Sequence, residues 1–118
     1  MPKILIVDDD RTMVALLQTL LELEGYTVNS TPLGQTAIRL SREDKPDIVF
    51  MDVHLADGDG VEVLRQIRAD PEIGRSRILM TSGLDMVEEC RRAGSDDFIM
   101  KPYSPDQLVT TLQRILDK

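Results

Sequence analysis

The chain has 118 residues, 42% of them hydrophobic and 30% charged, which is the composition of one globular domain rather than of a disordered chain. Its 21 acidic and 14 basic residues give a net charge of −7, which argues against direct binding to nucleic acid and favours cations and basic partner surfaces. No apolar run is long enough to span a membrane, and the single cysteine, Cys90, excludes an internal disulfide, so we expect one cytoplasmic domain over residues 1–118.

The first half of the chain alternates between strand and helix patterns. An aliphatic run from Lys3 to Val7 is typical of a buried strand, and it stops at three consecutive aspartates. The third of these, Asp10, is a good N-cap for the leucine-rich segment that follows, and Gly25 suits the position after its end. The pattern predicts, in order, a strand over Lys3–Val7, a helix over Arg11–Glu24, a strand over Tyr26–Asn29, a helix over Gln35–Arg42 and a strand over Ile48–Met51.

Turn and capping residues divide the second half. Asp59, followed three residues later by Glu62, resembles a capping box, and Ser104-Pro105 supplies an N-cap and a proline at the first helical position. Asp57 and Asp59 also suggest a calcium loop, but the ligand spacing fails at Val61, which favours turn and cap chemistry. This half predicts a helix from Asp59 to near Asp70, a strand over Arg77–Thr81, a helix over Met86–Ala93, a strand over Asp97–Met100 and a helix over Pro105–Leu116.

Alternating strand and helix units imply a parallel sheet with helices on both faces, because parallel neighbours are joined by right-handed helical crossovers. We therefore expect a doubly wound α/β fold, in which ligands bind beyond the carboxyl ends of the strands. The polar residues that the sequence places at those ends are Asp8, Asp9, Asp52, Thr81, Ser82 and Lys101.

These strand ends carry the groups that a metal-assisted phosphoryl transfer needs. The carboxylates of Asp8, Asp9 and Asp52 would repel each other in one crevice, so Lys101 and a divalent cation are needed to offset their charge. Ligands that are all oxygen favour Mg²⁺ or Mn²⁺. An ionised aspartate can itself attack phosphorus and form an acyl phosphate. We predict that Asp52 is the nucleophile and that Lys101 and Ser82 bind the phosphoryl oxygens.

Four motifs resemble the receiver domains of two-component response regulators, and the resemblance extends from Lys3 to Leu116. They are Ile4-Leu5-Ile6-Val7-Asp8-Asp9-Asp10, Ile48-Val49-Phe50-Met51-Asp52 followed by Asp59-Gly60, Ser82-Gly83, and Lys101-Pro102. The resemblance implies a flavodoxin-like, five-stranded parallel sheet in the order 2-1-3-4-5. It also implies that a sensor histidine kinase or phosphotransfer protein phosphorylates Asp52 as part of a phosphorelay.

The same resemblance implies switching and tuning roles. Ser82, rather than the alternative Thr81, is expected to bind the phosphoryl group, and Phe98 is expected to turn inward as Ser82 moves. This movement would remodel the face made by the fourth predicted helix, the fifth strand and the fifth helix. That face would serve a downstream effector, an attached output domain or a phosphorylation-dependent homodimer. His54 and Leu84 occupy positions that tune phosphoryl lifetime, in a signalling domain with only slow autophosphorylation and autodephosphorylation rather than an enzyme.

Three other functions fit parts of the pattern. A flavin-binding domain of this fold would need a Ser/Thr/Gly-rich anion cradle after the first strand, where Asp8-Asp9-Asp10 repels phosphate. A phosphohydrolase with an aspartyl intermediate would need a further acid two residues after the nucleophile, where the sequence has His54. An interaction module without phosphorylation would not need the complete set of reactive groups, so the sequence favours the receiver function.

Overall fold

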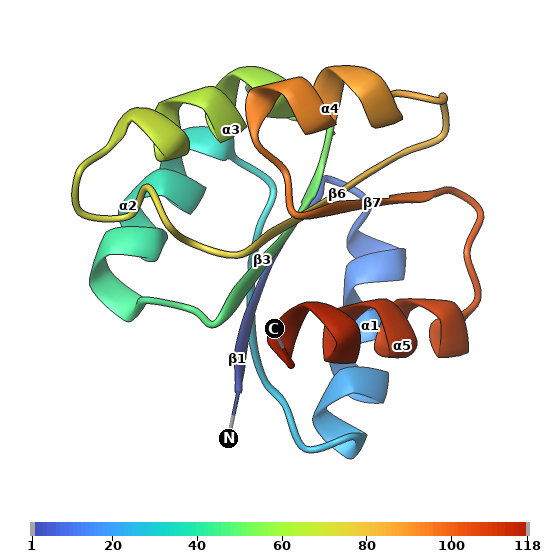
Figure 1. The fold of residues 1–118 in the computed structure, drawn as a ribbon. Coiled ribbons are helices and arrows are strands. Elements are labelled where there is room, and N and C mark those ends of the chain that lie inside the picture. Colours follow the sequence, from blue (N-terminus) through green and yellow to red (C-terminus); the bar gives the residue numbers. More distant parts are fainter. Residues whose placement is uncertain (1, 118) are drawn as a thin grey trace.

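A five-stranded parallel sheet in the order β2-β1-β3-β6-β7 forms the middle of the molecule (Figure 1). The structure is a computed structural model that describes residues 2–117, so Met1 and Lys118, which the prediction of one domain includes, lie outside the described residues. The strands are β1 (Lys3–Val7), β2 (Thr27–Thr31), β3 (Ile48–Asp52), β6 (Ile78–Ser82) and β7 (Asp97–Met100). Because β6 and β7 are the fourth and fifth predicted strands, the predicted doubly wound, flavodoxin-like α/β fold with strand order 2-1-3-4-5 is confirmed.

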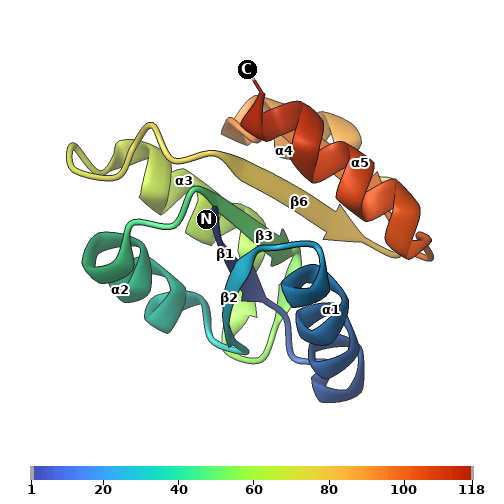
Figure 2. The same ribbon diagram turned by 90° about the horizontal axis from the view of Figure 1, so that it is seen from below.

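The helices cover the two faces of the sheet in separate layers, with α1 and α5 on one face and α2, α3 and α4 on the other (Figure 1, Figure 2). Their bounds are α1 (Arg11–Leu23), α2 (Gly34–Asp44), α3 (Gly60–Ala69), α4 (Val87–Ala93) and α5 (Pro105–Leu116). Strands β1, β3 and β6 are buried on both faces, as expected for strands that read as continuous apolar runs. No helix in the described part of the chain is long and apolar enough to cross a membrane.

Most helix ends lie where capping residues predict them. The Asp10 side chain accepts a hydrogen bond from Met13 N at 3.1 Å, and Gly25 follows α1 with a φ of 96°. Ser104 and Gln107 form a reciprocal capping box at the start of α5. Asp59 caps α3 as predicted, with its carboxylate accepting from Val61 N, but Glu62 pairs with Arg65, so the reciprocal capping box is not formed.

The apolar residues of α1 divide into two rows instead of one. Val14, Leu17 and Leu21, at positions i, i+3 and i+7, are buried against the sheet. Leu16 belongs to a neighbouring row and is 58% exposed. Helix α1 therefore presents apolar surface to the core and also to solvent.

A short hairpin that the sequence did not predict follows β3, and it caps a distant helix. Its strands are β4 (His54–Leu55) and β5 (Gly58–Asp59), and Asp57 lies in the turn between them. The Asp57 carboxylate accepts hydrogen bonds from Gly34 N at 2.7 Å and from Gln35 N at 3.2 Å. Leu33, at the N-cap position of α2, has no side-chain oxygen that could cap the helix. The Asp57 carboxylate serves as the cap in its place.

Replacing Asp57 with Ala should lower the free energy of unfolding by about 1 kcal/mol at neutral pH, the usual loss for a capping side chain. The hydrogen bond from Gly34 N holds the pKa of Asp57 below its ordinary value. Because the pKa is lower in the folded chain, this stabilisation is present above the unfolded value of about 3.9 and is lost as pH falls through the folded value. Urea unfolding followed by circular dichroism, at neutral pH and at a pH of about 3, measures the free energy of unfolding of both chains.

Asp57→Asn, which keeps an acceptor without the charge, is the control. A loss of stability in Asp57→Ala that is the same at both pH values would contradict the role of Asp57 as a cap.

Candidate functional site

The predicted acidic residues lie at the carboxyl end of the sheet. Asp8 directly follows β1 and Asp52 is the last residue of β3, which is next to β1. Lys101 directly follows β7, and its backbone N donates to Ser82 O at 2.8 Å, which continues the ladder between β6 and β7. The topology therefore brings side chains that are 93 residues apart in the sequence to one edge of the sheet.

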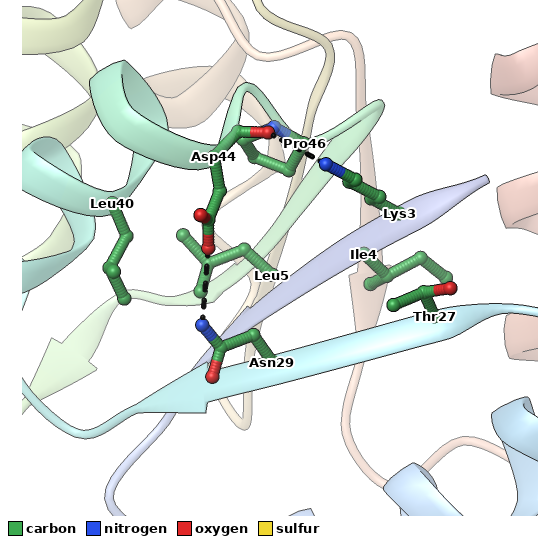
Figure 3. Close-up of a pocket in the computed structure, with 8 residues that line it drawn as sticks. All are labelled: Lys3, Ile4, Leu5, Thr27, Asn29, Leu40, Asp44 and Pro46. Atoms are coloured by element: carbon green, nitrogen blue, oxygen red, sulfur yellow. Dashed lines mark hydrogen bonds between the residues drawn. The ribbon is translucent and has the colours of Figure 1, made fainter.

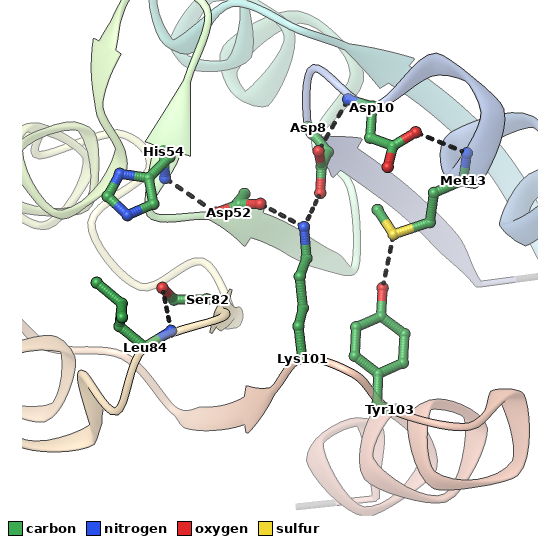
Figure 4. A network of polar contacts seen from close by, with 9 residues as sticks. All are labelled: Asp8, Asp10, Met13, Asp52, His54, Ser82, Leu84, Lys101 and Tyr103. Atoms are coloured by element: carbon green, nitrogen blue, oxygen red, sulfur yellow. Dashed lines mark hydrogen bonds and ion pairs between the residues drawn. The ribbon is translucent and has the colours of Figure 1, made fainter.

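Lys101 lies between the two buried carboxylates and pairs with both (Figure 4). Its Nζ is 2.5 Å from Asp52 Oδ2 and 3.1 Å from Asp8 Oδ2. Backbone groups hold the remaining oxygens, since His54 N donates to Asp52 Oδ1 at 2.9 Å and Asp10 N donates to Asp8 Oδ1 at 3.0 Å. The side chains of Asp8 and Asp52 are only 3% and 8% exposed, whereas that of Lys101 is 25% exposed. Lys101 is thus the residue of the cluster whose side chain is most open to solvent.

The charges in this cluster do not balance. Burial raises the pKa of Asp8, and the nearby charge of Asp52 raises it further, although hydrogen bonds from Asp10 N and Lys101 oppose the shift. Burial alone would lower the pKa of Lys101, but the hydrogen bonds to Asp52 and Asp8 outweigh it and raise the pKa. One ammonium shared by two buried carboxylates therefore leaves the site short of positive charge.

The donor set fits a hard divalent cation. Its oxygens come from carboxylates, which is the chemistry that Mg²⁺ and Mn²⁺ prefer, and the deficit of positive charge is what such an ion would correct. The three predicted ligands do not all converge, because Asp9 is exposed while Asp8 and Asp52 are buried around Lys101. Within residues 2–117, no group of three acidic, histidine or cysteine side chains is arranged to hold a metal ion.

The two hydroxyls that end β6 are both buried. Ser82 is 0% exposed, and its Oγ accepts a hydrogen bond from Leu84 N at 3.1 Å (Figure 4). Thr81 is 1% exposed, and its Oγ1 has no hydrogen-bond partner within the described residues. His54 and Leu84, the predicted tuning residues, are exposed beside Asp52 and Ser82 (Figure 4). Phe98, the predicted switch residue on β7, is half-buried against the core cluster beneath α2, α3 and α4.

Gly60 has a role that the sequence motif alone did not explain. A Cβ atom at this position would lie 2.2 Å from Asp52 O and 3.0 Å from Val53 Cα. Gly60 N also donates to Val53 O at 2.6 Å. Only glycine therefore lets α3 begin against the backbone of Asp52, and this contact fixes the carboxyl end of β3.

Tyr103, two residues after Lys101, lies beside the cluster, and the sequence analysis assigned it no role. Its ring meets Phe50 edge to face with the centroids 5.8 Å apart, and its hydroxyl donates to Met13 Sδ at 3.6 Å (Figure 4). Burial raises its pKa to about 12. Tyr103 thus stays a neutral, fixed side chain next to the charged groups.

A hollow of about 300 Å³ lies at the opposite end of the sheet, where β1 and β2 begin (Figure 3). Polar contacts there join Asn29 Nδ2 to Asp44 Oδ2 and Lys3 Nζ to Asp44 O, each at 3.4 Å. Ligands of doubly wound folds bind at the carboxyl ends of the strands, so this hollow is not part of the candidate site.

Comparison with known proteins agrees with this geometry. Residues 4–113 match the model of the response regulator receiver domain family. The chain is 37% identical over 119 residues to the alkaline phosphatase synthesis transcriptional regulatory protein PhoP of Bacillus subtilis, and the match covers 97% of this chain and 48% of PhoP. The chain therefore spans about half the length of this curated relative.

Solved structures of similar proteins share the whole fold. The chemotaxis response regulator CheY4 of Vibrio cholerae matches with a TM-score of 0.90 and 27% identity over 98% of both chains. The receiver domain of the sensor histidine kinase PA1611 from Pseudomonas aeruginosa, whose structure has magnesium coordinated in the active site cleft, matches with a TM-score of 0.89 and 29% identity. That match covers 99% of this chain and 98% of the other. By its sequence, its sheet order and the residues at its strand ends, this chain belongs to the receiver domain family of two-component response regulators.

Proposed function

We propose that this chain is a cytoplasmic signalling domain in which Asp52 accepts a phosphoryl group from a sensor histidine kinase or phosphotransfer protein, with Mg²⁺ or Mn²⁺ as cofactor. The observation that carries the proposal is the ion pair that Lys101 shares between Asp52 and Asp8. The pair brings the proposed nucleophile and an ammonium together where positive charge is short, and this supports a site that receives a phosphoryl group.

Each residue has a separate task in the proposed reaction. Asp8 and Asp52, with the exposed Asp9 turned toward them, would hold the divalent ion, which when bound neutralises charge on the phosphoryl oxygens. Asp52 attacks phosphorus with an electron pair that its carboxylate already carries, so no general base is needed. Lys101 leaves Asp52 and donates to a phosphoryl oxygen, and Ser82 supplies a hydroxyl donor from the end of β6.

Replacing Asp9 with Asn should weaken Mg²⁺ binding at least about tenfold, because it removes one anionic ligand from the set. Isothermal titration calorimetry with Mg²⁺ measures the change. Asp106→Asn removes another exposed acid, at the start of α5, and should leave the affinity unchanged. Equal affinities for all three chains would mean that Asp9 is not a ligand.

The face formed by α4, β7 and α5 is the proposed output surface. It exposes Val87 of α4 and Met100 of β7 by 46% and 48%, and Leu84, in the loop before α4, is 63% exposed. Helix α4 has only seven residues and no side-chain cap at its N-terminus, which suits an element that must shift. Phe98 is half-buried on β7, so an inward turn would bury more of its side chain. A downstream effector, an attached output domain or a second phosphorylated copy would bind this face.

A protein donor needs a surface beside Lys101, and α1 provides one. An apolar groove of about 280 Å³ runs between α1 and the segment after β7, and its lining includes Leu16, Leu20, Lys101 and Tyr103. Because the groove includes Lys101 itself, a partner seated there is within reach of the proposed acceptor. The exposed row of α1 therefore supports docking of the donor protein.

Replacing Leu16 with Lys should slow phosphoryl transfer from a histidine kinase by about tenfold or more, since it puts a charge into the apolar groove. The rate with acetyl phosphate, which needs no docking surface, should not change. Leu23→Lys is the matched control, because Leu23 is 80% exposed on the same helix but does not line the groove. If Leu16→Lys slows both donors equally, the groove is not a docking site.

A further inference from the structure

Thr81 carries a buried hydroxyl that has no partner in the described part of the chain. The residue is 1% exposed, and Oγ1 makes no hydrogen bond within residues 2–117. Ser41 is the only other described residue with a buried, unpaired side-chain oxygen. An unpaired buried hydroxyl destabilises a fold, and valine would fill the same space without this cost. The stability of the unphosphorylated structure therefore does not explain why residue 81 carries a hydroxyl.

The sheet places Thr81 next to Asp52 and on the same face. The two residues are partners in the parallel register of β3 and β6, and Val53 N donates to Thr81 O at 2.9 Å. Phe50 and Leu79, two residues earlier on each strand, both belong to the core cluster beneath α1 and α5. Since side chains alternate along a strand, Asp52 and Thr81 both point toward that side.

The resting carboxylate of Asp52 does not use this hydroxyl. His54 N donates to one of its oxygens and Lys101 Nζ donates to the other. A carboxylate can accept further hydrogen bonds, so a neighbouring hydroxyl can replace a donor that moves away. In the proposed reaction the donor that leaves is Lys101.

We propose that Thr81 is a positioning residue for Asp52, which donates its hydroxyl hydrogen to the Asp52 side chain when Lys101 turns to the incoming phosphoryl group. The inference rests on the proposed function. In the step concerned, an Asp52 oxygen forms a bond to the phosphorus of acetyl phosphate, the bond from phosphorus to the acetyl oxygen breaks, and acetate leaves with that electron pair. No proton is transferred, and Thr81 keeps its own.

Such a hydrogen bond would act selectively on the rate of phosphorylation. It is absent in the resting chain and present in the transition state, and only interactions that strengthen on the way to the transition state accelerate a reaction. It is equally present in the acyl phosphate, so hydrolysis should not depend on it. Thr81→Val should therefore fold at least as stably as the wild-type chain, yet take up phosphate about tenfold more slowly, the value of one hydrogen bond to a charged group.

The test compares four chains with acetyl phosphate and Mg²⁺, using intact mass to follow phosphoryl uptake and its loss after the donor is removed. Thr81→Ser keeps the hydroxyl and should phosphorylate at nearly the wild-type rate. Ser41→Ala removes the other unpaired hydroxyl, in α2 on the far face of the sheet, and should not alter either rate. Uptake of phosphate by Thr81→Val at the wild-type rate would overturn the role of Thr81, and so would equal slowing of Thr81→Ser and Thr81→Val. Neither result would affect the proposed function. Failure of the wild-type chain to accept phosphate would overturn the proposed function as well.

Discussion

Replacing Asp52 with Asn should abolish phosphoryl uptake completely, because the amide has no anionic oxygen to attack phosphorus. The same change should not destabilise the fold. Asn is nearly the same size, and its introduction leaves Lys101 paired with Asp8 alone, so the buried charges balance. Intact mass after incubation with acetyl phosphate and Mg²⁺ measures uptake, and urea unfolding measures stability. Because the chain has no tryptophan, circular dichroism is the suitable probe of unfolding.

The control for this experiment is Asp106→Asn, which removes an exposed carboxylate at the start of α5. It should accept one phosphoryl group as the wild-type chain does. Labelling of Asp52→Asn at the wild-type level would show that another residue is the acceptor. A marked loss of stability in Asp52→Asn would show instead that the carboxylate stabilises the fold. That result would contradict the excess of buried negative charge inferred for this cluster.

Replacing Lys101 with Ala should have two large effects. It leaves two buried carboxylates without a cation, which should lower the free energy of unfolding by about 2–3 kcal/mol; the loss is limited because Lys101 is partly exposed and Asp8 can take up a proton. It also removes a donor to the phosphoryl oxygens, which should slow uptake by about 100-fold or more. Urea unfolding and the rate of phosphorylation by acetyl phosphate measure the two effects separately.

Lys101→Arg separates charge from geometry. It keeps a cation beside Asp8 and Asp52, so most of the stability should remain, but a planar guanidinium cannot replace a compact ammonium at a crowded phosphoryl group. We therefore expect slow phosphorylation of a stable chain. Wild-type rates in both Lys101 variants would remove this residue from the proposed reaction.

The sheet could be predicted because its determinants are local. Residues 4–7, 48–51 and 78–80 are apolar without interruption, as strands buried on both faces must be, and proline, glycine and aspartate mark their ends. The division of α1 into two apolar rows was not predictable from spacing alone. Both rows satisfy helical periodicity, and only the position of the sheet decides that Val14 is buried and Leu16 is exposed.

The site could be predicted in composition but not in all of its contacts. Asp8 and Asp52 meet because they stand at the carboxyl ends of the neighbouring strands β1 and β3. Lys101 follows β7, which is not next to β3, and its long side chain reaches both carboxylates along the same edge of the sheet. The cap that Asp57 provides to α2 joins residues 23 apart through a hairpin with no strong sequence signal. The unpaired hydroxyl of Thr81 is likewise invisible in the sequence, because burial and the absence of a partner are properties of packing.

The most direct measurement locates the phosphoryl group itself. The wild-type chain is incubated with acetyl phosphate and Mg²⁺, the acyl phosphate is reduced with borohydride, which converts an aspartyl phosphate to homoserine, and the peptides are sequenced by tandem mass spectrometry. We predict homoserine at position 52 and at no other aspartate. Homoserine at Asp8, Asp9 or elsewhere, or none in a chain that has gained phosphate, would contradict the assignment of Asp52 as the acceptor.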